Sequence, residues 1–108
     1  MTRTYVAATL ELLRDWHAAG LVPSSAGRVP AEGDDEEAEY AALMTAADLS
    51  ADLLAGSGRR CVVVAETGDP DGELLWRQVV AVHVDTEDDA DPDDDLAWFA
   101  VQEVPHLV

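Results

Sequence analysis

Hydrophobic and polar positions along the chain predict that it begins with a strand followed by a helix. Residues 3–8 carry Tyr5 and Val6, an aromatic and a β-branched residue of the types that favour strands. Thr9 suits a helix N-cap, and the apolar residues after it recur at the three-to-four spacing of an amphipathic helix. Gly20 is placed to end this helix. The chain therefore opens with a β-α pair.

A second helix is predicted after a loop at residues 24–33. The carboxylates of residues 34–37 complement the dipole at its N-terminus, and an Ala-rich run without Gly or Pro favours helix as far as Gly56. Residues at helical spacing define the face that we expect to be buried, namely Tyr40, Leu43 or Met44, Ala47, Ala51 and Leu54.

Three further strands are predicted in the second half of the chain. Residues 60–67 form an apolar run typical of a strand buried on both faces, and 74–84 return after a turn to make a hairpin. Residues 96–104 alternate as a last strand that ends at Pro105. The order β-α-α-β-β-β predicts a single α+β domain over residues 1–108. We expect a mainly antiparallel four-stranded sheet with two helices on one face and the other face partly open.

Charge limits the partners that this chain can have. Asp and Glu number 23 against six Arg and no Lys, which gives a formal net charge of -17. That balance argues against nucleic acid or an anionic membrane as a ligand, and it permits a basic protein partner. Residues 85–95 are predicted to form an exposed acidic loop, because like charges at this density repel. A lone Cys61 and the absence of a signal peptide or membrane span predict a cytoplasmic protein.

Catalytic chemistry has one candidate combination in the sequence. His83 lies near Asp85 and opposite Glu103 if the last two strands pair, which would suit proton transfer or a metal site. A His beside an acidic loop is more often a surface residue, so we assign no catalytic residue. The acidic segment fits no calcium-binding loop, because Ala90 or Leu96 stands where the obligatory Gly belongs. The sequence therefore predicts no metal and no cofactor.

A non-enzymatic protein that acts through protein–protein contacts is the function we expect. Trp98 and Phe99 point to opposite faces of a strand, so one of them must lie on the open side of the sheet, where an exposed aromatic side chain is a docking anchor. We expect the partner to be a protein. In one alternative it is a basic protein, and in another it is a second copy of this chain that joins through an edge strand. A nucleic-acid mimic that inhibits a basic protein, or a small enzyme or metal site, remain alternative functions. The residues proposed for interaction are Tyr40, Trp98, Phe99 and Gln102.

Three strings in the sequence resemble a family of uncharacterised actinobacterial proteins. Residues 96–108, LAWFAVQEVPHLV, are similar to the family ending LLWYAxQE(I/L)PxL, and the strings EYAAL and VHVD in segments 37–43 and 80–85 match two more of its motifs. The resemblance implies a bacterial, cytoplasmic protein, here in a shortened form, and implies no activity. It directs attention to a set of positions for testing, which are Glu39, Tyr40, His83, Asp85, Trp98, Gln102 and Glu103.

Overall fold

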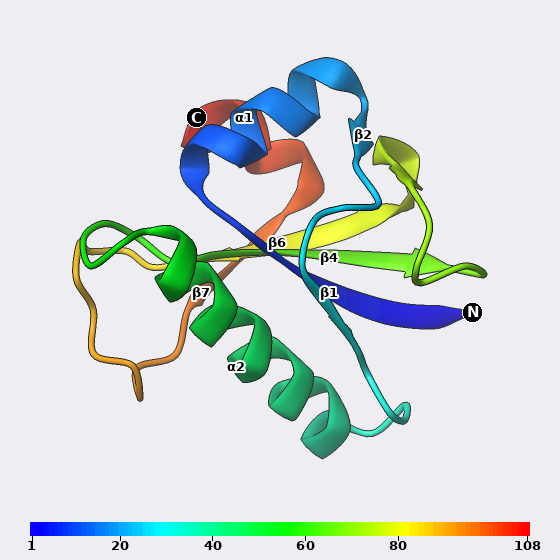
Figure 1. Ribbon diagram of the computed structural model, residues 1–108, viewed down its shortest axis with the longest axis horizontal. Coiled ribbons are helices and arrows are strands. Elements are labelled where there is room, and N and C mark those ends of the chain that lie inside the picture. Colours follow the sequence, from blue (N-terminus) through cyan, green and yellow to red (C-terminus); the bar gives the residue numbers. More distant parts are fainter.

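The computed structural model describes residues 1–108. Its elements form three layers, with an antiparallel sheet in the middle (Figure 1). The sheet has five strands in the order β3 (Arg28–Pro30), β1 (Thr2–Ala8), β4 (Cys61–Thr67), β6 (Val79–Val84) and β7 (Ala97–Ala100). A separate two-stranded sheet pairs β2 (Leu21–Val22) with β5 (Leu74–Leu75). The helices are α1 (Leu10–Ala19), α2 (Glu36–Leu53) and α3 (Val104–Leu107), with short 3-10 turns at Trp76–Gln78 and Val101–Glu103.

Both long helices begin where the capping residues predict. The Thr9 hydroxyl accepts a hydrogen bond from the Leu12 amide at 3.1 Å, and the Asp35 carboxylate accepts one from the Ala38 amide at 2.7 Å. Gly20 ends α1 with a φ of 80°, a left-handed conformation that favours glycine. None of the helices combines the length and the apolar composition that crossing a membrane requires.

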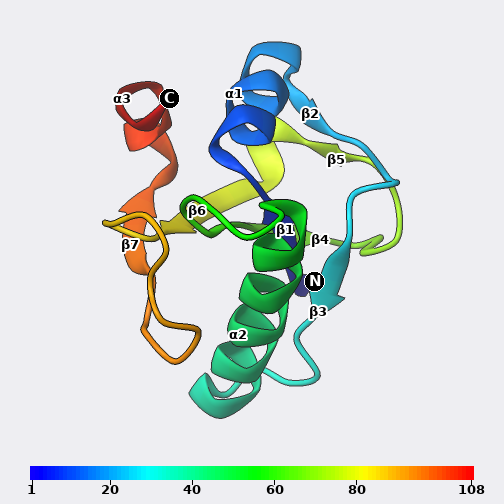
Figure 2. The ribbon, with the colours of Figure 1, turned by 60° about the vertical axis from the view of Figure 1, so that its left-hand side comes forward.

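The prediction that both helices cover one face of the sheet is wrong. Helix α2 packs on one face, while α1, α3 and the small sheet cover the other (Figures 1 and 2). The central strands supply apolar side chains to both layers, as Val63 does toward α1 and Val62 does toward α2. The expected burial of the 60–67 strand on both faces is confirmed, and it demands a layer on each side of the sheet.

Helix α2 buries the predicted face only in part, because Ala47 is fully buried and Leu43 and Met44 are half-buried, whereas Ala51 is exposed. Its buried residues are small, namely Ala42, Ala46, Ala47 and Ser50, whereas Tyr40 is 51% exposed. Small side chains let the helix approach the strands closely, and the hydroxyl of Ser50 donates to the Ala8 carbonyl at 2.7 Å and accepts from the Cys61 amide at 2.9 Å. The larger apolar residues of the helix are therefore left toward its edges.

The number and ends of the strands also differ from the prediction. Residues 28–30, expected in a loop, pair with β1 and make the fifth strand, and the predicted strand 74–84 is split by a 3-10 turn. The last strand ends at Ala100, and Pro105 lies in the first turn of α3 instead of ending a strand. A proline is tolerated there because the first amides of a helix have no partner within it.

Candidate functional site

A groove lies on the α2 side of the sheet, between α2 and the strands β6 and β7. It encloses about 420 Å³. Tyr40 and Leu43 of α2 form one wall, the sheet residues Ala81 and His83 form part of the floor, and Trp98 stands at the far side. The groove exists because α2 packs over β3, β1 and β4 and leaves the end of the sheet uncovered.

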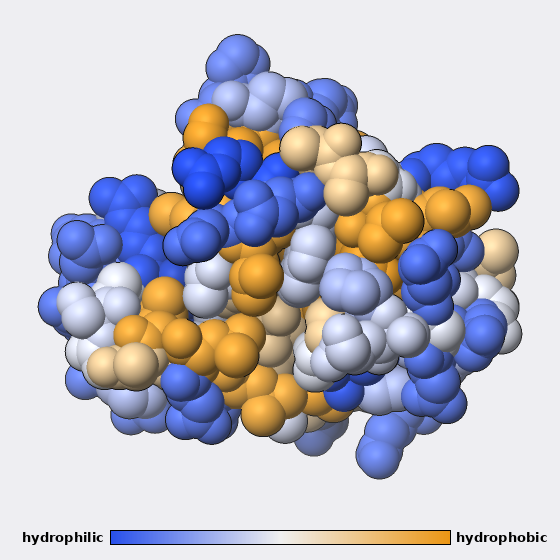
Figure 3. All heavy atoms as spheres, turned by 45° about the horizontal axis from the view of Figure 1, so that its top comes forward, coloured by the Kyte–Doolittle hydropathy of each residue, from blue (hydrophilic) through white to orange (hydrophobic).

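Exposed apolar residues gather in this groove. On the face shown in Figure 3, hydrophobic residues appear in patches between hydrophilic ones, as on most proteins. Tyr40, Val80 and Trp98 are three of the eight large hydrophobic residues that the structure leaves exposed, and all three line this one groove. Their clustering in one concave region is what distinguishes the groove from scattered exposure.

Strand register decides which aromatic residue of β7 faces the groove. Trp98 pairs with His83 and Phe99 pairs with Val82, so the two aromatic side chains lie on opposite faces of the sheet. Phe99 packs against the core under α1, while Trp98 is 61% exposed on the α2 side.

His83 forms an apolar part of the groove floor at neutral pH. Burial lowers the pKa of its imidazole, and its Nδ1 atom is buried without a hydrogen-bond partner. A charged imidazole is disfavoured in such surroundings. The side chain therefore acts mainly as a flat surface beside the indole of Trp98.

Carboxylates surround the apolar part of the groove. The Tyr40 hydroxyl donates to Asp95 Oδ1 at 2.8 Å, and this hydrogen bond raises the pKa of the phenol. Arg3 lies between two carboxylates, with Nη1 3.6 Å from Glu39 Oε1 and Nη2 2.6 Å from Glu66 Oε1. One guanidinium is thus already held at the end of the groove by the chain itself.

Comparison with known proteins identifies a family for the whole described chain. The model of a family of unknown function, DUF6912, matches residues 2–108. The chain belongs to DUF6912. This confirms the expected membership in a family without a known function. No curated protein and no solved structure matches the chain.

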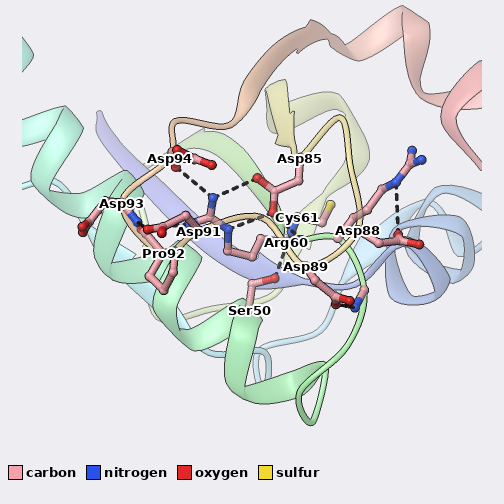
Figure 4. A network of polar contacts seen from close by, with 12 residues as sticks. Ser50, Arg60, Cys61, Asp85, Asp88, Asp89, Asp91, Pro92, Asp93 and Asp94 are labelled. Carbon is pink, nitrogen blue, oxygen red and sulfur yellow. Dashed lines mark hydrogen bonds and ion pairs between the residues drawn. The ribbon is translucent and has the colours of Figure 1, made fainter.

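The acid/base combination proposed from the sequence is not assembled by hydrogen bonds in this DUF6912 chain. Asp85 is 3% exposed and is held by Arg60, whose Nε donates to Oδ2 at 2.8 Å and whose Nη2 donates to Oδ1 at 2.9 Å (Figure 4). Glu103 accepts a hydrogen bond from the Ala100 amide at 2.7 Å. His83 bonds to neither carboxylate.

Metal and nucleophile chemistry find no support in the remaining side chains. No three His, Cys, Asp or Glu residues are grouped so that they can hold a metal ion. Burial raises the pKa of the Cys61 thiol to about 12, so it is not a thiolate at neutral pH.

Arg60 also fastens the acidic segment 85–95. Its Nη1 donates to the Pro92 carbonyl at 3.2 Å and its Nη2 to the Asp94 carbonyl at 2.8 Å (Figure 4). Asp89 exchanges hydrogen bonds with Gly58, each at 2.8 Å. Most side chains of the segment are exposed, while its backbone is tied to the body of the protein at several points.

The interaction residues proposed from the sequence fall into two places. Tyr40 and Trp98 meet in the groove, together with Glu39 and His83. Gln102 lines a separate hollow on the α1 side, next to His17 and Trp76, and Phe99 is also on that side. Sequence reasoning missed Val80, which a bulge in the pairing of β4 with β6 leaves exposed at the groove. It also missed Arg60, whose only signal was its place before a buried strand.

Proposed function

We propose that this DUF6912 chain is a non-enzymatic protein that docks a basic segment of a partner protein in the groove beside Trp98. The observation that carries the proposal is the indole of Trp98, 61% exposed, facing the same groove as the 51% exposed Tyr40. Exposed aromatic residues in a concave site are typical anchors of protein interfaces.

Charge selects the kind of partner. The chain carries a formal net charge of -17, and Glu36 lines the groove without an ion-pair partner. Arg3 at the end of the groove illustrates how a guanidinium is received between carboxylates. An arginine from a partner would combine stacking on Trp98 or Tyr40 with an ion pair to the rim.

Catalysis is less well supported by the same residues. Proton transfer needs a titratable group with access to substrate and a partner that orients it. Asp85 is committed to Arg60, and the buried Nδ1 of His83 has no orienting carboxylate. These contacts favour docking over acid/base chemistry.

Selection of peptides from a displayed random library tests this function. We expect wild-type protein to enrich peptides that combine arginine or lysine with apolar residues. Trp98→Ala should weaken the selected peptides at least about tenfold, a free-energy loss of about 1.4 kcal/mol. Leu53→Ala removes a 52% exposed apolar residue that lies outside the groove and should leave affinity unchanged.

Two outcomes of the selection would contradict the proposed function. The first is enrichment of acidic or uncharged peptides instead of basic ones. The second is equal loss of affinity in Trp98→Ala and Leu53→Ala, because the groove would then have no special part in binding.

A further inference from the structure

Strand β7 forms an open end of the five-stranded sheet. It is the last strand in the order and pairs only with β6, through Ala97 to Ala100 (Figure 2). The opposite end is β3, a strand of three residues. An edge strand offers unpaired backbone amides and carbonyls to another chain.

The contact of Glu103 shows which backbone groups of β7 face this open edge. The Ala100 amide donates to Glu103 Oε2 at 2.7 Å, so it points away from β6. In an antiparallel pair, residues two apart on one strand present their amides and carbonyls in the same direction. The amide and carbonyl of Trp98 therefore point outward as well, and those of Phe99 point toward β6.

We propose that the partner segment binds as an extended strand along the outer edge of β7, pairing with the backbone of Trp98. This inference rests on the proposed function and adds how the basic segment is held. Backbone pairing would fix the segment beside the Trp98 side chain, and alternate side chains of the segment would lie on the groove face of the sheet.

The surroundings of the edge favour a short basic strand over a second copy of this chain. The acidic residues of segment 91–95 lie just before β7 and Glu103 lies just after it, so carboxylates flank both ends. Two copies would each bring a charge of -17 to the contact and would repel one another. Glu103 also occupies the Ala100 amide, which limits the edge that can be paired.

Two matched peptides separate strand pairing from docking by side chains alone. Each is a capped peptide of alternating arginine and valine, about six residues long, which is a usual strand length. One is N-methylated on its odd-numbered amides and the other on its even-numbered amides. Only one of the two sets faces β7 in a paired strand. We expect one methylated peptide to bind like the unmodified one and the other at least about tenfold more weakly.

Hydrogen exchange of the Trp98 backbone amide provides the second measurement. This amide should exchange fast in the free protein, unlike that of Phe99, and should slow at least about tenfold when the unmodified peptide is saturating. In Trp98→Ala the amide of residue 98 should still slow, at a higher peptide concentration, because the edge is backbone.

Each remaining outcome overturns the inference in a recognisable way. If both methylated peptides bind equally and the indole N–H resonance of Trp98 shifts while its backbone amide exchange does not slow, the groove docks peptides without strand pairing. If no peptide binds, the proposed function fails as well. A dimer seen by sedimentation at low salt, with a slow Trp98 amide in the absence of peptide, would assign the edge to a second copy.

Discussion

Arg60 illustrates how a single buried residue controls a whole segment. Its guanidinium is 4% exposed and donates four hydrogen bonds, two to Asp85 and one each to the carbonyls of Pro92 and Asp94. A buried charge is tolerated when it is paired and well hydrogen-bonded, and four of the five N–H donors of this guanidinium are bonded. The neighbouring Arg59 is exposed and makes one ion pair, with its Nε 3.4 Å from Asp88 Oδ1. The two arginines thus form a natural comparison.

Replacing Asp85 with Ala should be strongly destabilising. The change leaves the buried guanidinium of Arg60 without its counter-charge, and breaking such a pair costs about 3–5 kcal/mol. Arg59→Ala should change the free energy of unfolding by no more than about 1 kcal/mol, because exposed pairs contribute little. Urea unfolding of both variants measures the difference. Equal effects would show that the Arg60 network contributes no more than a surface pair.

Acidification should destabilise the protein through His83. Burial lowers the folded pKa of its imidazole below the ordinary 6.5, so the unfolded state binds a proton that the folded state does not. The stability linked to neutral His83 is present above 6.5 and is lost as pH falls through the folded pKa. The other charged and titratable groups of the groove include Arg3, Glu39 and Tyr40. They are all still present in the variant His83→Phe, so they contribute equally to both proteins.

The comparison with His83→Phe therefore isolates the contribution of the imidazole. As the pH falls from about 8 to about 5, the free energy of unfolding of the wild type should decrease relative to that of the variant. Chemical denaturation at a series of pH values measures it. A difference that is independent of pH would mean that the imidazole titrates alike in both states.

At the scale of elements, the packing of α2 determines where the groove lies. The helix contacts the sheet through Ala42, Ala46, Ala47 and Ser50, and so it lies close over β1. Its larger side chains, including Tyr40 and Leu43, are displaced to the groove wall. A helix that docked through those larger residues would fill the space in which Trp98 now stands exposed.

Enlarging a buried alanine of α2 should be costly, whereas enlarging an exposed one should not. Ala46→Leu adds volume at a fully buried position, and overpacking of this kind costs roughly 1–3 kcal/mol. Ala41→Leu makes the same change at an exposed position of the same helix and should have little effect. Thermal unfolding of the two variants checks this, and similar melting temperatures would contradict the close approach of α2.

Helices whose ends are marked by neighbouring residues could be predicted from the sequence. How the elements pack together could be predicted only in part. The caps at Thr9 and Gly20 and the acidic start of α2 act through neighbouring residues, so sequence alone located both helix starts. The buried face of α2 was predicted only in part: Ala47 is buried as expected, but large apolar residues such as Tyr40 were preferred over the small ones that permit close packing.

The candidate site divides in the same way. Alternation placed Trp98 and Phe99 on opposite faces without any structure, whereas pairing with β6 was needed to show that Trp98 is the exposed one. Nothing local joins Arg60 to Asp85, which are 25 residues apart, so this contact depends on the fold. The 28–30 strand was missed because three residues, one of them a proline, carry too little pattern.

At the scale of the whole molecule, the net charge opposes folding and favours the basic partner that we propose. A net charge of -17 on a chain of 108 residues repels itself in the compact state, and only six arginines offset it. The ion pairs present use Arg3, Arg59 and Arg60. Most carboxylates therefore remain available to attract a basic partner, and both effects depend on salt.

Salt should stabilise the folded protein. Raising NaCl from about 10 mM to about 1 M shortens the screening length from roughly 30 Å to roughly 3 Å, which weakens repulsion among exposed carboxylates. The free energy of unfolding in urea should therefore rise with salt. The buried Arg60 pair is screened little and should not reverse this trend. A fall in stability with salt would indicate that surface ion pairs outweigh the net repulsion.

The most direct test of the docking account is an NMR titration of ¹⁵N-labelled protein with the unmodified alternating arginine–valine peptide. We predict the largest shifts at the indole and backbone of Trp98 and at Tyr40, Val80 and His83, and we expect them to be lost in Trp98→Ala. Shifts confined to the acidic residues 86–95, or unchanged by Trp98→Ala, would contradict the account, because the peptide would then be bound by net charge alone.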